Sequence, residues 1–250
     1  MNNITMGFIL TILAGLSTMI GTIIIFFKKK TNNILISSLG FAAGVMLCVS
    51  LTDLIPESYN LLKDNFSFFL TILYILIFIN IGFIFSMCID KYLPEVKETN
   101  HKGLYRVGII SMLAIILHNV PEGIATFMAT TSDITLGISL AIAIALHNIP
   151  EGIGISVPIY YSTKSRRKAL LYTFISGVSE PFGALLAYLF LSKYINNTIM
   201  GFLFSFIAGI MMHISLYELL PTSKKYNNKK LSYLFLIIGI LFMYVTHILK

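Results

Sequence analysis

Eight long apolar segments constrain the fold of this 250-residue chain more than any other feature of its sequence. A helix needs about 20 predominantly apolar residues to cross the hydrocarbon core of a bilayer. The segments that meet this requirement are residues 5–27, 34–57, 67–90, 105–129, 135–160, 167–191, 199–221 and 231–248. None has the alternating pattern of a membrane β-strand, and a helical bundle is the other way to satisfy backbone groups in lipid. The sequence therefore predicts an all-α membrane protein, with residues 1–250 in a single transmembrane domain.

The charged residues agree with this class and indicate an orientation. They make up 12% of the sequence, whereas soluble domains carry about 25%. Most Lys and Arg residues, 15 of 18, lie in or beside the odd-numbered connections: Lys28, Lys29, Lys30, Lys91, Lys97, Lys102, Arg106, Lys164, Arg166, Arg167, Lys168, Lys224, Lys225, Lys229 and Lys230. Because basic loops stay in the cytoplasm, both termini are expected to be extracytoplasmic. Because the basic residues lie between the apolar segments, the net charge of +7 does not indicate a nucleic-acid partner.

Two of the apolar segments resemble each other at an offset of 165 residues. Residues 41–46 read FAAGVM and residues 206–211 read FIAGIM, while residues 50–56 (SLTDLIP) match residues 215–221 (SLYELLP). The matching segments are the second and the seventh, which cross the membrane in opposite directions. The pattern predicts three helices, a central pair and three further helices in an inverted repeat, an arrangement characteristic of secondary transporters.

A hexapeptide occurs twice in the central pair, as HNVPEG at residues 118–123 and HNIPEG at residues 147–152. In each copy the histidine and the glutamate are four residues apart, so they share one face of a helix. Besides Glu122 and Glu151, a third glutamate, Glu180, lies near the middle of the sixth segment. A charged group at the bilayer centre costs about 2.5–3.5 kcal/mol on insertion scales. Since no span core contains Lys or Arg, a bound cation is the natural counter-charge.

The other residues of the hexapeptides extend this interpretation. Asn119 and Asn148 offer neutral oxygens beside the glutamates, so that each glutamate is able to bridge two adjacent metals. Pro121 and Pro150 are each expected to kink their helix and free a carbonyl. This set of nitrogen and oxygen ligands suits Zn²⁺, Fe²⁺, Mn²⁺ or Co²⁺ better than Mg²⁺ or Ca²⁺.

Further candidates for a metal pathway lie in the second and seventh segments: Met46, Ser50, Asp53, Glu57, His213 and Glu218. The acids are expected at the mouths, with Asp53 and Glu57 toward the outside and Glu218 toward the inside. His213 is either an intermediate ligand or a packed histidine. Met46 and Ser50 either contact the metal or belong to the apolar core.

The hexapeptides, the SEPFGA sequence of residues 179–184 and the matching FAAG and FIAG sequences together resemble the ZIP (Zrt/Irt-like) family of divalent metal transporters, in its bacterial branch with a broad metal range. The resemblance implies import of zinc foremost, and also of iron, manganese, cobalt or cadmium, across the cell membrane into the cytoplasm. It also implies a homodimer and a rocking or elevator-like motion of a four-helix unit. No cofactor is expected besides the transported ion.

The resemblance also implies a binuclear site. One metal is bound by His118, Glu122, His147 and Glu151. The second is bound by Asn119, Asn148 and Glu180, with the two glutamates of the hexapeptides bridging. The alternative function is a membrane-embedded metalloenzyme, which usually needs an HExxH spacing that this chain lacks.

Overall fold

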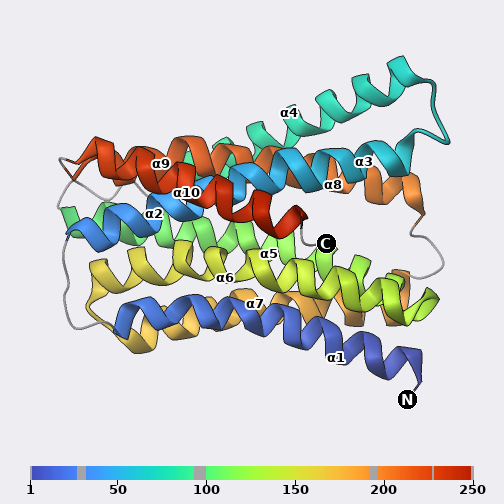
Figure 1. Cartoon of the computed structure of the whole chain (residues 1–250), viewed down its shortest axis with the longest axis horizontal. Helices are drawn as coiled ribbons and strands as arrows, with labels where there is room; N and C mark the ends of the chain where they lie inside the picture. The colour runs from blue at the N-terminus through green and yellow to red at the C-terminus, as the bar shows by residue number, and fades with distance from the viewer. Residues whose placement is uncertain (1, 27–31, 93–99, 192–195, 227, 249–250) are drawn as a thin grey trace.

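The computed structural model describes residues 2–26, 32–92, 100–191, 196–226 and 228–248. Throughout these ranges the regular structure is helical and no strand is present. Eight of the described helices, counted with their continuous extensions, are long and apolar enough to cross a membrane (Figure 1). The sequence-based prediction of an all-helical protein with eight apolar spans is thereby confirmed.

Several spans are built from more than one kind of helix. The first is α1 (Asn3–Leu16) continued by a 3₁₀ segment, Ser17–Phe26, and the second joins α2 (Asn32–Val49) to α3 (Ile55–Leu62) through a π turn, Ser50–Leu54. The others are α4 (Phe68–Tyr92), α5 (Asn100–Ser132), α6 (Ile134–Thr163), α7 (Arg166–Leu186) with a π turn Ala187–Leu191, α8 (Asn197–His213) with a π turn Ile214–Leu219 leading into α9 (Leu220–Lys224), and α10 (Lys229–Ile248).

The helices are longer than the predicted segments because polar residues continue or cap them beyond the apolar core. Asp133 alone separates α5 from α6, and its carboxylate accepts the backbone N–H of Thr135 at 2.7 Å and of Leu136 at 3.4 Å, which satisfies orphan donors of the first turn. The third connection, expected at about 91–104, is shorter because α5 begins at Asn100. Residues 27–31 and 93–99, which carry several of the predicted cytoplasmic lysines, lie outside the described residues.

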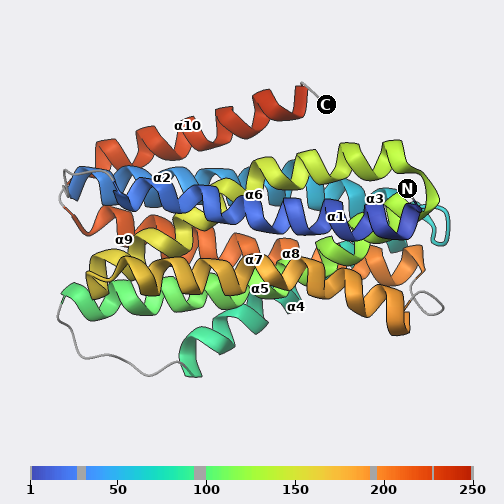
Figure 2. The same cartoon turned by 90° about the horizontal axis from the view of Figure 1, so that it is seen from below.

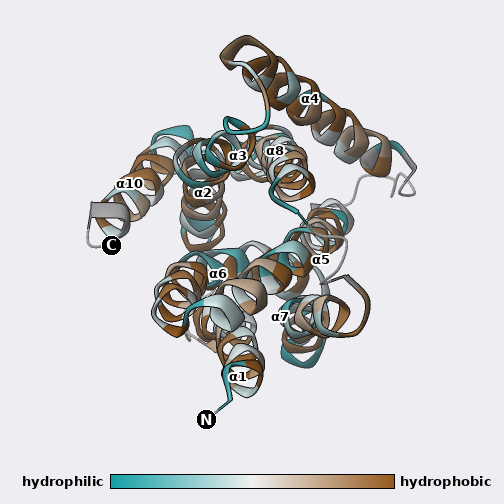
Figure 3. Ribbon diagram, turned by 90° about the vertical axis from the view of Figure 1, so that its right-hand side faces the viewer, coloured by the Kyte–Doolittle hydropathy of each residue, from teal (hydrophilic) through white to brown (hydrophobic). Residues whose placement is uncertain are grey.

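The helices form two groups. The first is a four-helix bundle of α1, α5, α6 and α7, and the second contains α2, α3, α8 and α9 with α4 and α10 packed on it (Figures 1 and 3). The groups meet mainly where α2 packs against α6 and α8 against α5. Figure 2 shows α4 and α10 on opposite outer edges of the molecule. The two hexapeptides therefore lie on helices that face the contact between the groups.

Glycines of the hexapeptides allow neighbouring backbones to approach closely. A Cβ placed on Gly123 would lie 1.8 Å from the carbonyl oxygen of Glu180, and one on Gly152 would lie 1.9 Å from that of Thr18. Only glycine fits at these crossings, because any larger residue would push the helices apart. The contacts hold α7 against α5 and the 3₁₀ segment against α6.

Two prolines lie inside the helices that carry the hexapeptides. Pro121 is inside α5 and Pro150 is inside α6, and both helices continue without interruption through these residues. The expected kinks remain predictions.

Candidate metal site

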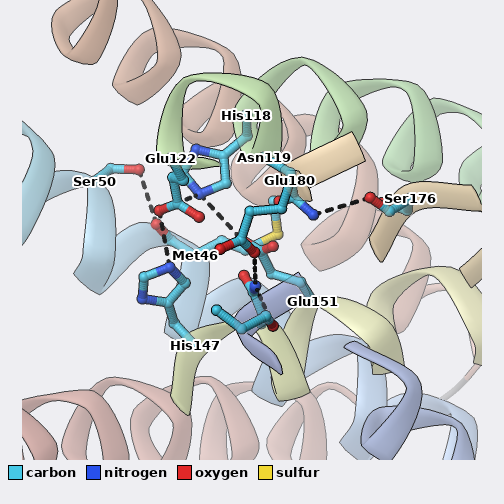
Figure 4. A network of polar contacts seen from close by, with 11 residues as sticks. Met46, Ser50, His118, Asn119, Glu122, His147, Glu151, Ser176 and Glu180 are labelled. Atoms are coloured by element: carbon cyan, nitrogen blue, oxygen red, sulfur yellow. Dashed lines mark hydrogen bonds and ion pairs between the residues drawn. The ribbon is translucent and has the colours of Figure 1, made fainter. Parts of the chain in front are cut away.

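The two hexapeptides face each other across the contact between α5 and α6. The shared point is Glu122, whose Oε1 lies 3.1 Å from His118 Nε2 and 3.0 Å from His147 Nε2 (Figure 4). Glu151 joins from α6, with Oε1 at 3.6 Å from His118 Nε2. Ligand atoms of His118, Glu122 and His147 all lie within 4.8 Å of one another, a separation that lets them bind one small cation.

These four residues are withdrawn from solvent, with exposed fractions of 5% or less. Several of their polar atoms have no hydrogen-bond partner among the described residues, including Glu122 Oε2, both Glu151 carboxylate oxygens and the Nδ1 atoms of both histidines. Buried polar groups normally have partners, so a set of orphaned acceptors requires explanation. A divalent cation with imidazole and carboxylate ligands satisfies this requirement.

The asparagines are oriented by backbone carbonyls of the neighbouring helices. Asn119 Nδ2 donates to the Ser176 carbonyl of α7 at 3.1 Å, and Asn148 Nδ2 donates to the Ala14 carbonyl of α1 at 3.0 Å. Because each amide nitrogen is held by an acceptor, the amide oxygen is the end left for another partner. Both oxygens are buried and have no hydrogen-bond partner within the described ranges, so both are available to a cation.

Glu180 is linked to the hexapeptide of α6 through a single hydrogen bond. Asn148 Nδ2 donates to Glu180 Oε2 at 2.9 Å, while Glu180 Oε1 has no hydrogen-bond partner among the described residues. The side chain is fully buried. Helix α7 therefore adds a third carboxylate to the cluster, in the neighbourhood that the sequence predicted (Figure 4).

Two of the predicted pathway residues lie beside the cluster. Met46 and Ser50 of the second span are both buried, and Figure 4 shows them next to the cluster. The Ser50 hydroxyl donates to the Met46 carbonyl at 2.8 Å. One turn further on, Asp53 is half-buried in the π turn and accepts the Thr52 hydroxyl at 3.1 Å. Polar side chains therefore continue along this face of the second span, from Ser50 beside the cluster to Asp53.

The remaining pathway candidates lie elsewhere. Glu57 is exposed on α3, and Glu218 is half-buried in the π turn that follows α8. His213 is buried against α4, where its Nδ1 lies 3.0 Å from the Ser86 hydroxyl and its ring stacks on Tyr217 at a centroid distance of 5.5 Å. These contacts match the packed histidine that the sequence left open, and a ligand role for His213 remains a prediction.

Sequence reasoning missed the backbone carbonyls of Ala14 and Ser176. Their contribution does not depend on a side chain, so no residue type at positions 14 and 176 identifies them. The signal that existed was indirect, because Gly15 and Gly177 each leave room for the other helix: a Cβ on Gly15 would lie 2.3 Å from the Gly177 carbonyl. That contact brings α1 and α7 close enough for both to reach the asparagines.

Comparisons with known proteins identify the family of the chain. The family model described as ZIP zinc transporter matches residues 98–247. The chain is 42% identical to the zinc transporter ZupT of Clostridium perfringens, over 100% of this chain and 97% of that protein. It is 43% identical to the zinc transporter ZupT of Streptococcus mutans, over 97% of each, and 40% identical to that of Oceanobacillus iheyensis, over 100% of this chain and 99% of that protein. The chain belongs to the ZIP family of zinc transporters.

Proposed function

We propose that this protein imports divalent transition metals, zinc foremost, through the buried cluster between α5, α6 and α7. The observation that carries the proposal is the convergence of His118, Glu122, His147 and Glu151, whose carboxylates include oxygens with no hydrogen-bond partner in the described part of the chain. ZIP proteins are transporters and not enzymes, so the metalloenzyme alternative is not favoured. The ligand chemistry also accommodates iron, manganese, cobalt and cadmium.

The cluster holds two metal ions in this proposal. The first is bound by the two histidines with Glu122 and Glu151. The second is bound by the amide oxygens of the two asparagines and by Glu180, with both hexapeptide glutamates bridging. The orphaned second oxygen of Glu122 and the two buried amide oxygens support this division.

We infer that the chain is a 3+2+3 inverted repeat, and paired backbone contacts around the cluster support this. A Cβ on each of four glycines would lie 2.3 Å or less from a carbonyl oxygen: Gly123 with Glu180, Gly152 with Thr18, Gly183 with Val120, and Gly21 with Ile149. The contact of Gly123 matches that of Gly152, and the contact of Gly183 matches that of Gly21. In both matches the residues on α5 and α6 are 29 positions apart, as 123 and 152 are. Their partners on the other two helices are 162 positions apart, as 18 and 180 are.

A second set of contacts repeats in the other group of helices. Here the pairs are Gly44 with the Leu236 carbonyl and Gly209 with that of Ile79, and Gly239 with the Phe41 carbonyl and Gly82 with that of Phe206. In both pairs the matching positions on α2 and α8 are 165 residues apart, as 44 and 209 are. This is the same offset as that of the repeated sequence. The π turns Ser50–Leu54 and Ile214–Leu219 end 165 residues apart and begin 164 residues apart.

The repeat suggests a route. Asp53 and Glu57 form the outer mouth and Glu218 the inner mouth, with Met46 and Ser50 beside the central cluster. The connections rich in Lys and Arg face the cytoplasm, which sets both termini outside the cell membrane. The four-helix bundle that holds the cluster moves against the second group, and the protein works as a homodimer.

Zinc uptake by reconstituted vesicles tests the proposal. Wild-type protein is expected to fill vesicles with zinc, as followed by a trapped fluorescent indicator, and Glu122→Ala and Glu151→Ala are expected to abolish uptake. The matched control is Asp64→Asn, which changes an exposed acid in the connection between α3 and α4. Undiminished uptake by both glutamate variants would exclude the cluster as the transport site.

A further inference from the structure

An asparagine lies in the middle of α4 on the face that points away from the rest of the molecule. Asn80 is exposed, and it sits near the centre of the apolar span Phe68–Ile89. In the most apolar 18-residue stretch of this span, only 17% is buried inside the protein. The corresponding share is 72% in the span Asn32–Leu62. Figure 3 shows α4 at the edge of the molecule, beyond α8. The side chain of Asn80 therefore points outward at a depth where lipid hydrocarbon surrounds the protein.

Among the residues that the structure describes, the amide of Asn80 is only partly satisfied. Its Nδ2 donates to the Leu76 carbonyl at 2.7 Å, one turn earlier in the helix. An asparagine side chain has two N–H donors and an acceptor oxygen, and that bond uses one donor. Lipid tails offer no hydrogen-bonding partner at mid-membrane. A polar group at this position needs a partner from another molecule.

The neighbours of Asn80 on this face form a regular apolar row. Residues three or four apart along α4 are exposed on both sides of it: Phe69, Leu73, Leu76, Ile84 and Met87. The opposite face of α4 is occupied, since Gly82 lies against the Phe206 carbonyl and Ser86 contacts His213. The outer row has the spacing by which two helices pack side by side.

We propose that this face of α4 is where two copies of the chain pair, with the Asn80 amides hydrogen-bonded to each other. A two-fold axis perpendicular to the membrane places identical residues at the same depth. The electropositive N–H group of one amide then faces the electronegative oxygen of the other, so the asparagine is complementary to its own copy. A different partner protein would need a polar group at this same depth.

This inference rests on the homodimer included in the proposed function and names its surface. The metal cluster lies in the other group of helices, and α4 packs mainly on α8. Changes to the outer face of α4 are therefore expected to alter pairing while the ligands of the cluster stay in place. In the wild-type protein, absence of pairing with intact zinc uptake would overturn the α4 surface alone, and absence of uptake with intact pairing would overturn the role of the cluster alone.

Cysteine cross-linking in native membranes tests the surface. The background is Cys88→Ser, which removes an exposed thiol from α4, while Cys48 is buried. In this background, Asn80→Cys and Leu76→Cys are expected to give a dimer on oxidation with copper phenanthroline, and Leu76→Cys keeps Asn80 intact. The controls are Leu241→Cys on α10 and Ile142→Cys on α6, which are similarly exposed at 55% and 58%. Cross-linking no greater than in the controls, or cross-linking to a different protein, overturns the proposal.

Association in lipid vesicles tests the asparagine pair itself. Measured by energy transfer between labelled copies over a range of protein-to-lipid ratios, Asn80→Leu is expected to weaken pairing by about 3- to 20-fold, the effect of one hydrogen bond between membrane helices. Asn80→Gln keeps the amide and is expected to retain most of the pairing. Zinc uptake per chain, measured on the same vesicles, reports on the cluster separately. Unchanged pairing in Asn80→Leu, or monomeric wild-type protein, overturns the proposal.

Discussion

Glu122 Oε1 on α5 lies 3.0 Å from His147 Nε2 on α6, which is the closest side-chain link between the two hexapeptides. The same oxygen lies 3.1 Å from His118 Nε2 on its own helix. One carboxylate therefore joins ligands from both hexapeptide helices. We expect Glu122 to be the residue whose loss most weakens metal binding.

Glu122→Gln keeps the shape of the side chain and removes its charge. Zinc affinity, measured by calorimetry on purified protein, is expected to fall by more than about 100-fold, because even outer-shell partners of a metal contribute about 10- to 100-fold. Asp64→Asn is the control and is expected to bind zinc like the wild type. An affinity for the glutamine variant within a few-fold of the wild type would contradict the role given to Glu122.

Glu180→Gln separates the two metal positions. Glu180 reaches the cluster only through Asn148 among the hydrogen bonds described, at 2.9 Å, and it is assigned to the second metal alone. Bound zinc, counted by elemental analysis after dialysis, is expected to fall from two ions per chain to one. Two ions retained in this variant, or none, would argue against a site divided in this way.

Gly123→Ala tests the packing that holds α7 against α5. The added Cβ would lie 1.8 Å from the Glu180 carbonyl oxygen, and overpacking of this kind costs about 1–3 kcal/mol or more. A lower unfolding temperature in detergent is expected, together with weaker metal binding. Gly103→Ala is the matched control, because no atom of the described residues beyond its own stretch of helix lies within 4 Å of its Cβ position. Equal stability of the two variants would show that the helix crossing tolerates a side chain.

Ser86→Ala distinguishes packing from transport at His213. The change removes the contact of 3.0 Å between α4 and α8 and is expected to lower the free energy of unfolding by about 1 kcal/mol. Zinc affinity and uptake are expected to stay at wild-type values. Weaker uptake at unchanged stability would instead favour His213 as a ligand on the route.

The number of spans and the central cluster could be predicted from the sequence for simple physical reasons. An apolar segment of about 20 residues has few alternatives to a membrane helix, and Glu122, Glu151 and Glu180 are too costly in such segments without partners. Both observations depend on residue type alone, which a sequence contains directly.

The ends and internal irregularities of the helices could not be predicted in the same way. The second span was expected to end at residue 57, yet helix continues to Leu62 because a π turn at Ser50–Leu54 precedes Pro56. Proline lacks a backbone N–H, and a π turn changes which carbonyls need a donor. The carbonyls of Ala14 and Ser176 were likewise out of reach, since their role comes from the packing of α1 and α7 around the asparagines.

Anomalous X-ray diffraction from zinc-loaded crystals, collected on both sides of the zinc absorption edge, tests the central claim most directly. Two neighbouring peaks are expected within the buried cluster, the first among His118, His147, Glu122 and Glu151 and the second beside Asn119, Asn148 and Glu180. Zinc peaks confined to acids outside the cluster, such as Glu57 and Glu218, would contradict the claim that this site carries the transported metal.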